Sequence, residues 1–164
     1  GDVLTAAQLN GVVENFNDVA IFREEQASGT TGGTFTSGSY VKRTLNTTVV
    51  NNITGCSIAS SVITLPAGTF SVTAFAPAQE VARNKCRIQN TTASTTLQIG
   101  NNCFANTTDG SNTATVNTVF TLATASTIEL QHRCAQTIAG YGFGTASSFG
   151  DAEVFASITI QRIA

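Results

Sequence analysis

The feature that most constrains this chain is a two-residue alternation of apolar and polar side chains that recurs over most of its length. The segment TFSVTAFA places four apolar side chains on one face: Phe70, Val72, Ala74 and Ala76. Successive side chains of a β-strand point to opposite faces, so this period predicts a strand with one buried face. The 27 threonines favour the same structure, because β-branched side chains suit a pleated surface.

The same alternation returns in later segments that are separated by turn-forming residues. Their predicted inward positions are Cys86, Ile88, Leu97, Ile99, Val116, Phe120, Leu122, Ile128, Leu130, His132, Cys134, Val154, Ala156, Ile158 and Ile160. The segment SIASSVITLPAG predicts a strand that enters a turn around Pro66 and Gly68 and forms a hairpin with the next strand. About eight short strands with turns between them predict an all-β antiparallel sandwich or jelly roll.

The start of the chain has a different period. Apolar residues recur there at steps of three and four, which predicts a short amphipathic helix with Thr5 as its N-cap. Such a helix is marginal in water on its own, and Gly11 inside it costs about 1 kcal/mol. Two covers for its apolar stripe stay open: the chain's own sheet, or the same helix from other copies around a symmetry axis. The stripe consists of Leu9, Val12, Val13, Phe16, Val19 and Ala20.

These patterns divide the chain into three parts. We expect residues 1–22 to form the helix, for trimerisation and attachment, and residues 23–38 to form a Gly/Ser/Thr linker with the first strand. Residues 39–164 then form the jelly-roll domain, since a chain of 164 residues is an ordinary length for one domain.

The charge pattern excludes several classes of partner. The net charge is -2 and no run of Lys or Arg is present, so we expect no nucleic-acid partner. No apolar stretch approaches the ~20 residues that cross a bilayer, so we expect no membrane insertion. A basic segment followed by an apolar one is also missing, so we expect no signal peptide. Gly1 fits either removal of an initiator Met or loss of the natural start.

The side chains that carry catalysis are too few or too dispersed for an enzyme. His132 is the single histidine, and it shares the inward side of its strand with Cys134. We interpret the pair as a core histidine beside a core thiol, because a nucleophile and its base need further partners to act. No G-x-S-x-G elbow is present. We therefore expect no catalytic residue.

Metal sites, cofactors and covalent links are equally weakly indicated. Four carboxylates outside the helix lie on separate predicted elements, namely Glu80, Asp109, Glu129 and Asp151, and no glycosidase pair is predicted. The segment TTDGSN is interpreted as a turn, since it lacks the several acidic ligands of a calcium loop, and we expect no metal and no cofactor. The pairing of Cys56, Cys86, Cys103 and Cys134 stays open, and we expect structural thiols that are free or singly paired. The sequons at Asn46, Asn52, Asn90 and Asn106 are interpreted as chance matches.

Three segments, in this order, resemble a known family: GGTFTSGSYVKRTLNT, ITLPAGTFSVTAFAPAQEVARNKCRIQN and IELQHRC…YGFG…FGDAEVFASITI. They are similar to the C-terminal jelly-roll modules of tailed-phage fibre and related virion surface proteins, whose fold resembles that of complement and tumour necrosis factor. The likeness covers roughly residues 31–163. Tyr40 stands where the family has Trp, and no shaft lies between the helix and the knob.

The resemblance implies a non-enzymatic, homotrimeric protein of the virion that takes part in host attachment through a fibre-type knob. Other virion proteins of the tail or capsid would contact the N-terminal segment, and host surface polysaccharide would contact distal loops. The loop residues we expect to bind are Asp109, Gly110, Tyr141 and Phe143. The segment AGYGFGTASSFG has two interpretations, an exposed aromatic loop or a tight corner whose rings cover the core.

Two other functions stay open at this point. A trimeric capsid decoration protein would use the helix and linker for its main contacts. A secreted complement-like binding module would carry glycans at Asn46 or Asn90. Host, receptor and position on the virion are not determined by the sequence.

Overall fold

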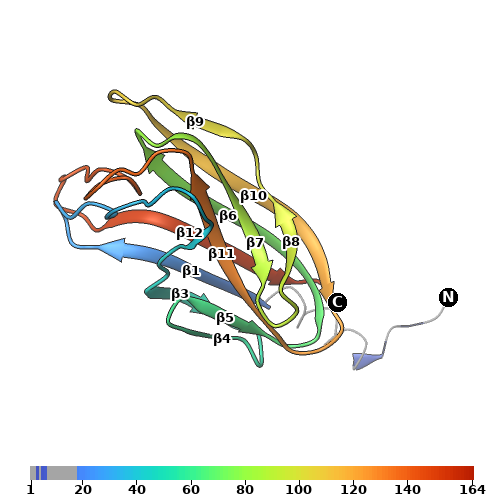
Figure 1. The fold of residues 1–164 in the computed structure, drawn as a ribbon. Coiled ribbons are helices and arrows are strands. Elements are labelled where there is room, and N and C mark those ends of the chain that lie inside the picture. Colours follow the sequence, from blue (N-terminus) through green and yellow to red (C-terminus); the bar gives the residue numbers. More distant parts are fainter. Residues whose placement is uncertain (1–2, 4, 7–17) are drawn as a thin grey trace.

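The computed structural model describes residue 3, residues 5–6 and residues 18–164, and over this part the chain forms two antiparallel sheets that face each other (Figure 1). The prediction of an all-β antiparallel sandwich is confirmed. The strands are β1 (Val19–Gln26), β2 (Val41–Lys42), β3 (Thr47–Asn51), β4 (Ser57–Ala59), β5 (Val62–Leu65), β6 (Gly68–Gln79), β7 (Ala82–Asn90), β8 (Thr95–Ile99), β9 (Cys103–Ala105), β10 (Ser111–Leu122), β11 (Ser126–Cys134) and β12 (Glu153–Arg162).

The connections between the sheets are those of a jelly roll. A five-stranded sheet has the order β10-β6-β12-β1-β3, and a seven-stranded sheet has the order β4-β5-β11-β7-β8, with β2 on β11 and β9 on β7. From β5 to β7 and again from β9 to β12, successive strands cross from one sheet to the other. Both sheets therefore bury one face in a shared core.

The predicted hairpin around Pro66 and Gly68 is wrong. The turn is present, but β5 pairs with β4 and β11, whereas β6 pairs with β10 and β12. The chain uses this turn to pass between the sheets. Sequence alternation shows that two strands each have a buried face, but it does not show whether they share a sheet.

The predicted inward faces form the core in nearly every strand. Phe70, Val72, Ala74 and Ala76 of β6 are all 1% exposed or less, and they pack with the inward residues of β7, β10, β11 and β12. Ile99 of β8 and Val154 of β12 are exceptions. Ile99 is 53% exposed, because β8 lies at the edge of its sheet. The pairing of β1 with β12 shifts between Glu24 and Glu25, which places Val154 at the surface with 37% exposure.

The helix predicted over residues 1–22 is wrong at its C-terminal end. Residues 19–22 belong to β1, where Val19 is half-buried and pairs with Gln161 of β12. The first strand therefore begins at Val19 and not within 23–38. Ala20 and Phe22 fit a helical stripe as well as an alternating strand, and long-range pairing with β12 and β3 decides between the two. Leu9, Val12, Val13 and Phe16 lie outside the described residues.

The two ends of the sandwich differ. Asp18 and Ala164 lie at the same end of the sandwich. There the Arg162 amide donates a hydrogen bond to the Asp18 carbonyl (2.9 Å), and the Thr69 amide donates one to the Ala164 carbonyl (2.7 Å). The loops after β6, β9 and β11 lie at the opposite end (Figure 1). The four cysteines are free thiols. Within the described residues, no helix has the length and apolarity that a bilayer span requires.

Candidate functional site

The loop end is organised by Glu80, which stands in the turn between β6 and β7. Its carboxylate accepts hydrogen bonds from the Tyr141 hydroxyl (2.9 Å) and the Asp109 amide (3.1 Å). Its own amide donates to the Gly110 carbonyl (2.7 Å). Three of the four residues expected in the distal loops, Asp109, Gly110 and Tyr141, are thus brought together.

Backbone geometry keeps this cluster in place. Glu80 and Asp109 both have positive φ angles, 58° and 56°, in the left-handed region that the tight turns require. A Cβ on Gly110 would stand 2.3 Å from the Asn106 nitrogen, so the turn needs glycine. Hydrogen bonding to Glu80 and the charge of that carboxylate raise the pKa of Tyr141, so the phenol stays a donor. The TTDGSN segment is a turn, as predicted.

Phe143 does not belong to this cluster, and its assignment as a loop contact is corrected. Its ring stacks on Phe35 with centroids 4.4 Å apart, and the Arg43 guanidinium lies 4.0 Å above it. This part of AGYGFGTASSFG is therefore a corner that covers the core. Phe149, further along the same loop, is 87% exposed.

Beneath the corner lies a buried charged group that the sequence does not reveal. The Arg43 side chain is 0% exposed and donates to the carbonyls of Phe155 (2.9 Å) and Pro77 (3.1 Å) and to the Glu24 carboxylate (3.2 Å). Burial lowers the pKa of Arg43 to about 10, which leaves it protonated at neutral pH. Burial also raises the pKa of Glu24, against the opposing effect of Arg43. The group links the two sheets to the loop.

His132 and Cys134 are core residues, as predicted. His132 is 0% exposed, packs on Phe35 with ring centroids 4.7 Å apart, and its Nε2 lies 3.1 Å from Oδ1 of Asn84. Burial, assisted by the charge of Arg43, holds the pKa of His132 well below its usual value. Burial raises the pKa of Cys134 to about 11. A thiol that stays protonated beside a solvent-inaccessible imidazole is not an activated nucleophile.

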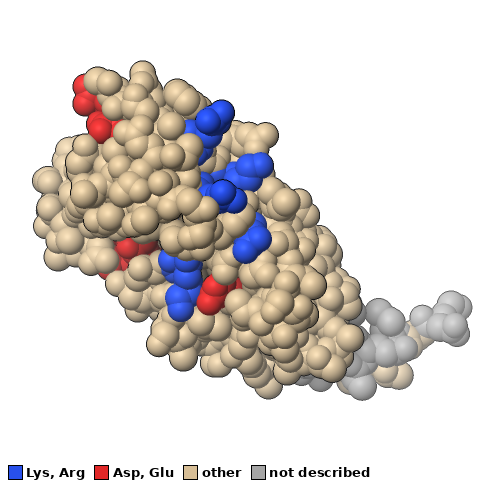
Figure 2. All heavy atoms as spheres, in the orientation of Figure 1, with Lys and Arg blue, Asp and Glu red and all other residues tan. Residues whose placement is uncertain are grey.

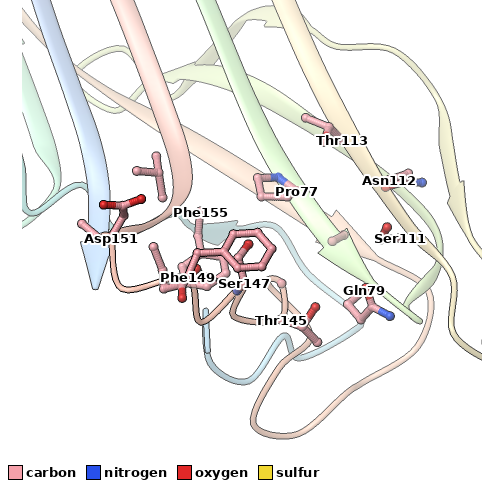
Figure 3. A pocket seen from close by; sticks show the side chains of 15 residues that line it. Pro77, Gln79, Ser111, Asn112, Thr113, Thr145, Ser147, Phe149, Asp151 and Phe155 are labelled. Carbon is pink, nitrogen blue, oxygen red and sulfur yellow. Dashed lines mark hydrogen bonds between the residues drawn. The ribbon is translucent and has the colours of Figure 1, made fainter. Parts of the chain in front are cut away.

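A hollow of about 460 Å³ lies between the loop after β11 and the five-stranded sheet (Figure 3). Phe149 and Phe155 form one wall, and residues of β6 and β10 that include Pro77 and Thr113 form the other. Glu153 anchors this loop, because its carboxylate accepts hydrogen bonds from the amides of Gly29, Ser147 and Ser148 (2.8–3.0 Å). These bonds lower the pKa of Glu153.

The outer face of the five-stranded sheet is almost free of charge. Its charged side chains, Arg23 and Glu25 of β1, form an ion pair with each other. Its exposed apolar side chains include Phe75 at 37% and Val119 at 59%. The outward positions of β6, β10 and the middle of β12 are Ser71, Thr73, Phe75, Pro77, Thr113, Thr115, Asn117, Val119, Thr121, Ser157, Thr159 and Gln161.

The outer face of the seven-stranded sheet is different, because a band of Lys and Arg crosses it (Figure 2). Five of the eight cations of the chain lie there, on β2, β7 and β11: Lys42, Arg83, Lys85, Arg87 and Arg133. Among the described residues, no group of three or more His, Cys, Asp and Glu side chains is arranged to hold a metal ion.

Comparison with known proteins gives a fold but no family. No family model matches the chain. No curated protein matches it either. Among solved structures, the chain is similar to the globular domain of a zebrafish complement 1qA protein, with a TM-score of 0.59, 12% identity, and coverage of 90% of this chain and 98% of that one.

Two further structures share the fold. Murine APRIL has a TM-score of 0.58 and 10% identity over 88% of this chain and 98% of that one. The vertex protein P5 of the phage PRD1 has a TM-score of 0.51 and 15% identity over 90% of this chain and 98% of that one. The jelly roll expected from the sequence resemblance is thus confirmed at the level of the fold.

Proposed function

We propose that this chain is a non-enzymatic structural protein of a tailed-phage virion, a homotrimeric fibre-type knob that takes part in host attachment. The observation that carries the proposal is the nearly uncharged outer face of the five-stranded sheet. A wide face of Thr, Ser, Asn and apolar side chains is favourable to cover with another copy, because few charges must lose their water. The likeness to the PRD1 vertex protein supports the assignment to a virion.

The two ends of the sandwich suit this role. Asp18 and Ala164 lie at the end opposite the loops, so in this proposal that end faces the particle and the Glu80 cluster points outward. Asp109, Gly110 and Tyr141 present carboxylate, carbonyl and phenol groups, which suit the hydroxyls of a host polysaccharide. In this proposal they make the first contact with the host surface.

The mass of the purified chain tests the trimer. Light scattering at micromolar concentration should give three times the 17.0 kDa of one chain. Val119→Lys should abolish the trimer. It removes about 1 kcal/mol of apolar burial per copy, and it buries an ammonium at a cost of several kcal/mol.

Ile99→Lys is the matched control, because Ile99 is 53% exposed and Val119 is 59% exposed, but Ile99 lies on β8 of the other sheet. It should leave the mass unchanged. A folded wild-type protein with the mass of one chain would contradict the trimer. Dissociation of both variants would contradict the assignment of the contact to the five-stranded sheet.

The second candidate is a capsid decoration trimer that stabilises the head. Labelling of the assembled particle with an antibody to this chain separates the two, since the fibre proposal requires label at the tail and the decoration proposal requires label over the shell. Particles without label would contradict both.

A secreted complement-like module is the third candidate, and the complement 1qA likeness favours it at the level of the fold. The two sequons on which this candidate depends, at Asn46 and Asn90, argue against it. Asn90 is 5% exposed and its Oδ1 accepts a hydrogen bond from the Ala93 amide (2.9 Å). The side-chain amide of Asn46 accepts a hydrogen bond from the Glu25 backbone amide and donates one to the Glu25 carbonyl, both 2.8 Å long. Glycan found at either asparagine would restore this candidate.

A further inference from the structure

The basic band on the seven-stranded sheet is unusual for a chain of net charge -2. Five cations lie on this face, and Glu129 is the acidic side chain beside them, 3.9 Å from Lys42. The cations come from positions 42 to 133, so a search for a run of Lys or Arg misses them, and the fold assembles the band. The rest of the molecule carries the balancing negative charge.

Among the residues that the structure describes, three of these cations have no counter-ion. Lys85 of β7 is paired directly with Arg133 of β11, and Arg83 lies two residues before Lys85 on β7. Like charges opposite each other in an antiparallel pair destabilise the sheet. Within residues 18–164, no carboxylate forms an ion pair with Arg83, Lys85 or Arg133. The unfavourable arrangement is therefore retained without internal compensation, as at sites where function outweighs stability.

These cations surround a hollow of about 660 Å³, a volume within the ~300–1,000 Å³ of small-molecule sites. Tyr40 and Asn102 complete its rim with groups that can hydrogen-bond to hydroxyls. The Arg87 guanidinium lies 3.9 Å above the Tyr40 ring and donates to Gln131 Oε1 (2.8 and 2.9 Å). One wall of the site is thus fixed in place before a ligand arrives.

We propose that this hollow binds an acidic polysaccharide, with Arg83, Lys85 and Arg133 on its anionic groups and Asn102 and Tyr40 on its hydroxyls. The site is distinct from the loop cluster and does not depend on the proposed function. Nucleic acid fits less well, because affinity for it comes from neutralising many phosphates and single strands stack their bases on aromatic side chains. One face of the Tyr40 ring is already covered by Arg87.

The test is binding of the purified full chain to immobilised polygalacturonate, with neutral dextran, dextran sulfate and poly(U) RNA as comparisons. The wild type should bind polygalacturonate, and this binding should weaken steeply with added NaCl. It should not bind dextran. The double variant K85Q/R133Q should bind at least about tenfold more weakly, because two charge-assisted contacts are lost. R23Q/R162Q removes the same charge from the other sheet and, provided that light scattering gives it the wild-type mass, should bind as the wild type does.

Three results would overturn the proposal. Stronger binding to poly(U) than to polygalacturonate would make nucleic acid the ligand. Equal retention of K85Q/R133Q and R23Q/R162Q would show attraction by total charge and not by this site. No binding to polygalacturonate or dextran sulfate would show that the hollow takes no acidic polysaccharide. A monomeric chain that binds would contradict the trimer and leave this site standing.

Discussion

Replacement of Arg43 by methionine tests whether a buried charge holds the loop corner to both sheets. The variant keeps an unbranched side chain in the space but removes the donors to two carbonyls and to Glu24. Loss of one partner of a buried ion pair costs about 3–5 kcal/mol, because the remaining charge is left without compensation. Domains of this kind have a total stability of about 5–15 kcal/mol, so the effect should be large.

The measurement is urea unfolding of the wild type and three variants. Arg43→Met should lower the free energy of unfolding by about 3–5 kcal/mol. The double variant Glu24→Gln/Arg43→Met should recover part of this loss, since no carboxylate is then left without its partner. Arg87→Met is the control: Arg87 also lies over an aromatic ring, at 3.9 Å, but it is only half-buried, and its loss should cost at most about 1 kcal/mol.

The pH dependence of the stability gives a second, independent test of this ion pair. Without Arg43, desolvation raises the pKa of Glu24 further above its unfolded value of 4.5. The folded state then binds more protons than the unfolded state, so stability is lost as pH rises through the folded pKa of Glu24. Arg43→Met should therefore be less damaging at pH 5 than at pH 8. Release of His132 from the Arg43 charge acts in the same direction, and the Glu24→Gln background separates the two effects. An equal loss for Arg43→Met and Arg87→Met at both pH values would refute the reasoning.

Three further predictions concern the loop and the core beneath it. His132 has a pKa lowered well below 6.5, so the wild type should lose about 1.4 kcal/mol per pH unit below about 6 and His132→Gln should not, as urea titrations at several pH values would show. Glu153 has a lowered pKa, so the anchoring that it provides is present above pH 4.5 and is lost as pH falls through its folded pKa. Glu153→Gln should therefore speed hydrogen exchange of the amides that bind its carboxylate, and the control Asp151→Asn should not. Gly144→Ala should destabilise by about 1–3 kcal/mol in thermal unfolding, since the new Cβ would stand 2.7 Å from the Phe155 ring.

The sequence predicts the buried faces of the strands well, and the partners and ends of the strands less well, for a physical reason. Alternation in β6, β7 and β11 reflects burial of one face, and burial is what those strands share. Val19 is misassigned because apolar residues at steps of three and four continue into a segment that also alternates. Glu24 stands at an inward position where the alternating pattern requires an apolar residue. The pattern therefore does not predict this strand, because its buried partner Arg43 is known only from the structure.

The candidate sites are less predictable because they are made by contacts across long sequence separations. Glu80 joins Asp109 and Tyr141, which lie 29 and 61 residues away along the chain. Turn residues and aromatic residues in loops identified those two positions, but no local signal identifies Glu80 as their link. Phe143 carried the same loop signal and lies inward, because Arg43 and Phe35 offer it a buried partner on each side.

The two proposals meet in one prediction about polymer length. In a trimer closed through the five-stranded sheet, the basic hollows lie on the outward sheet of each copy, so a long acidic polysaccharide can contact more than one of them. Linked contacts raise affinity by about a hundredfold to ten-thousandfold where the chain can span the sites. Val119→Lys should therefore bind long polygalacturonate at least tenfold more weakly than the wild type does, and trigalacturonate equally well, in calorimetric titrations. Ile99→Lys should match the wild type for both lengths. If the monomeric variant and the wild type bind the long polymer equally well, each hollow binds on its own and assembly does not contribute to the affinity.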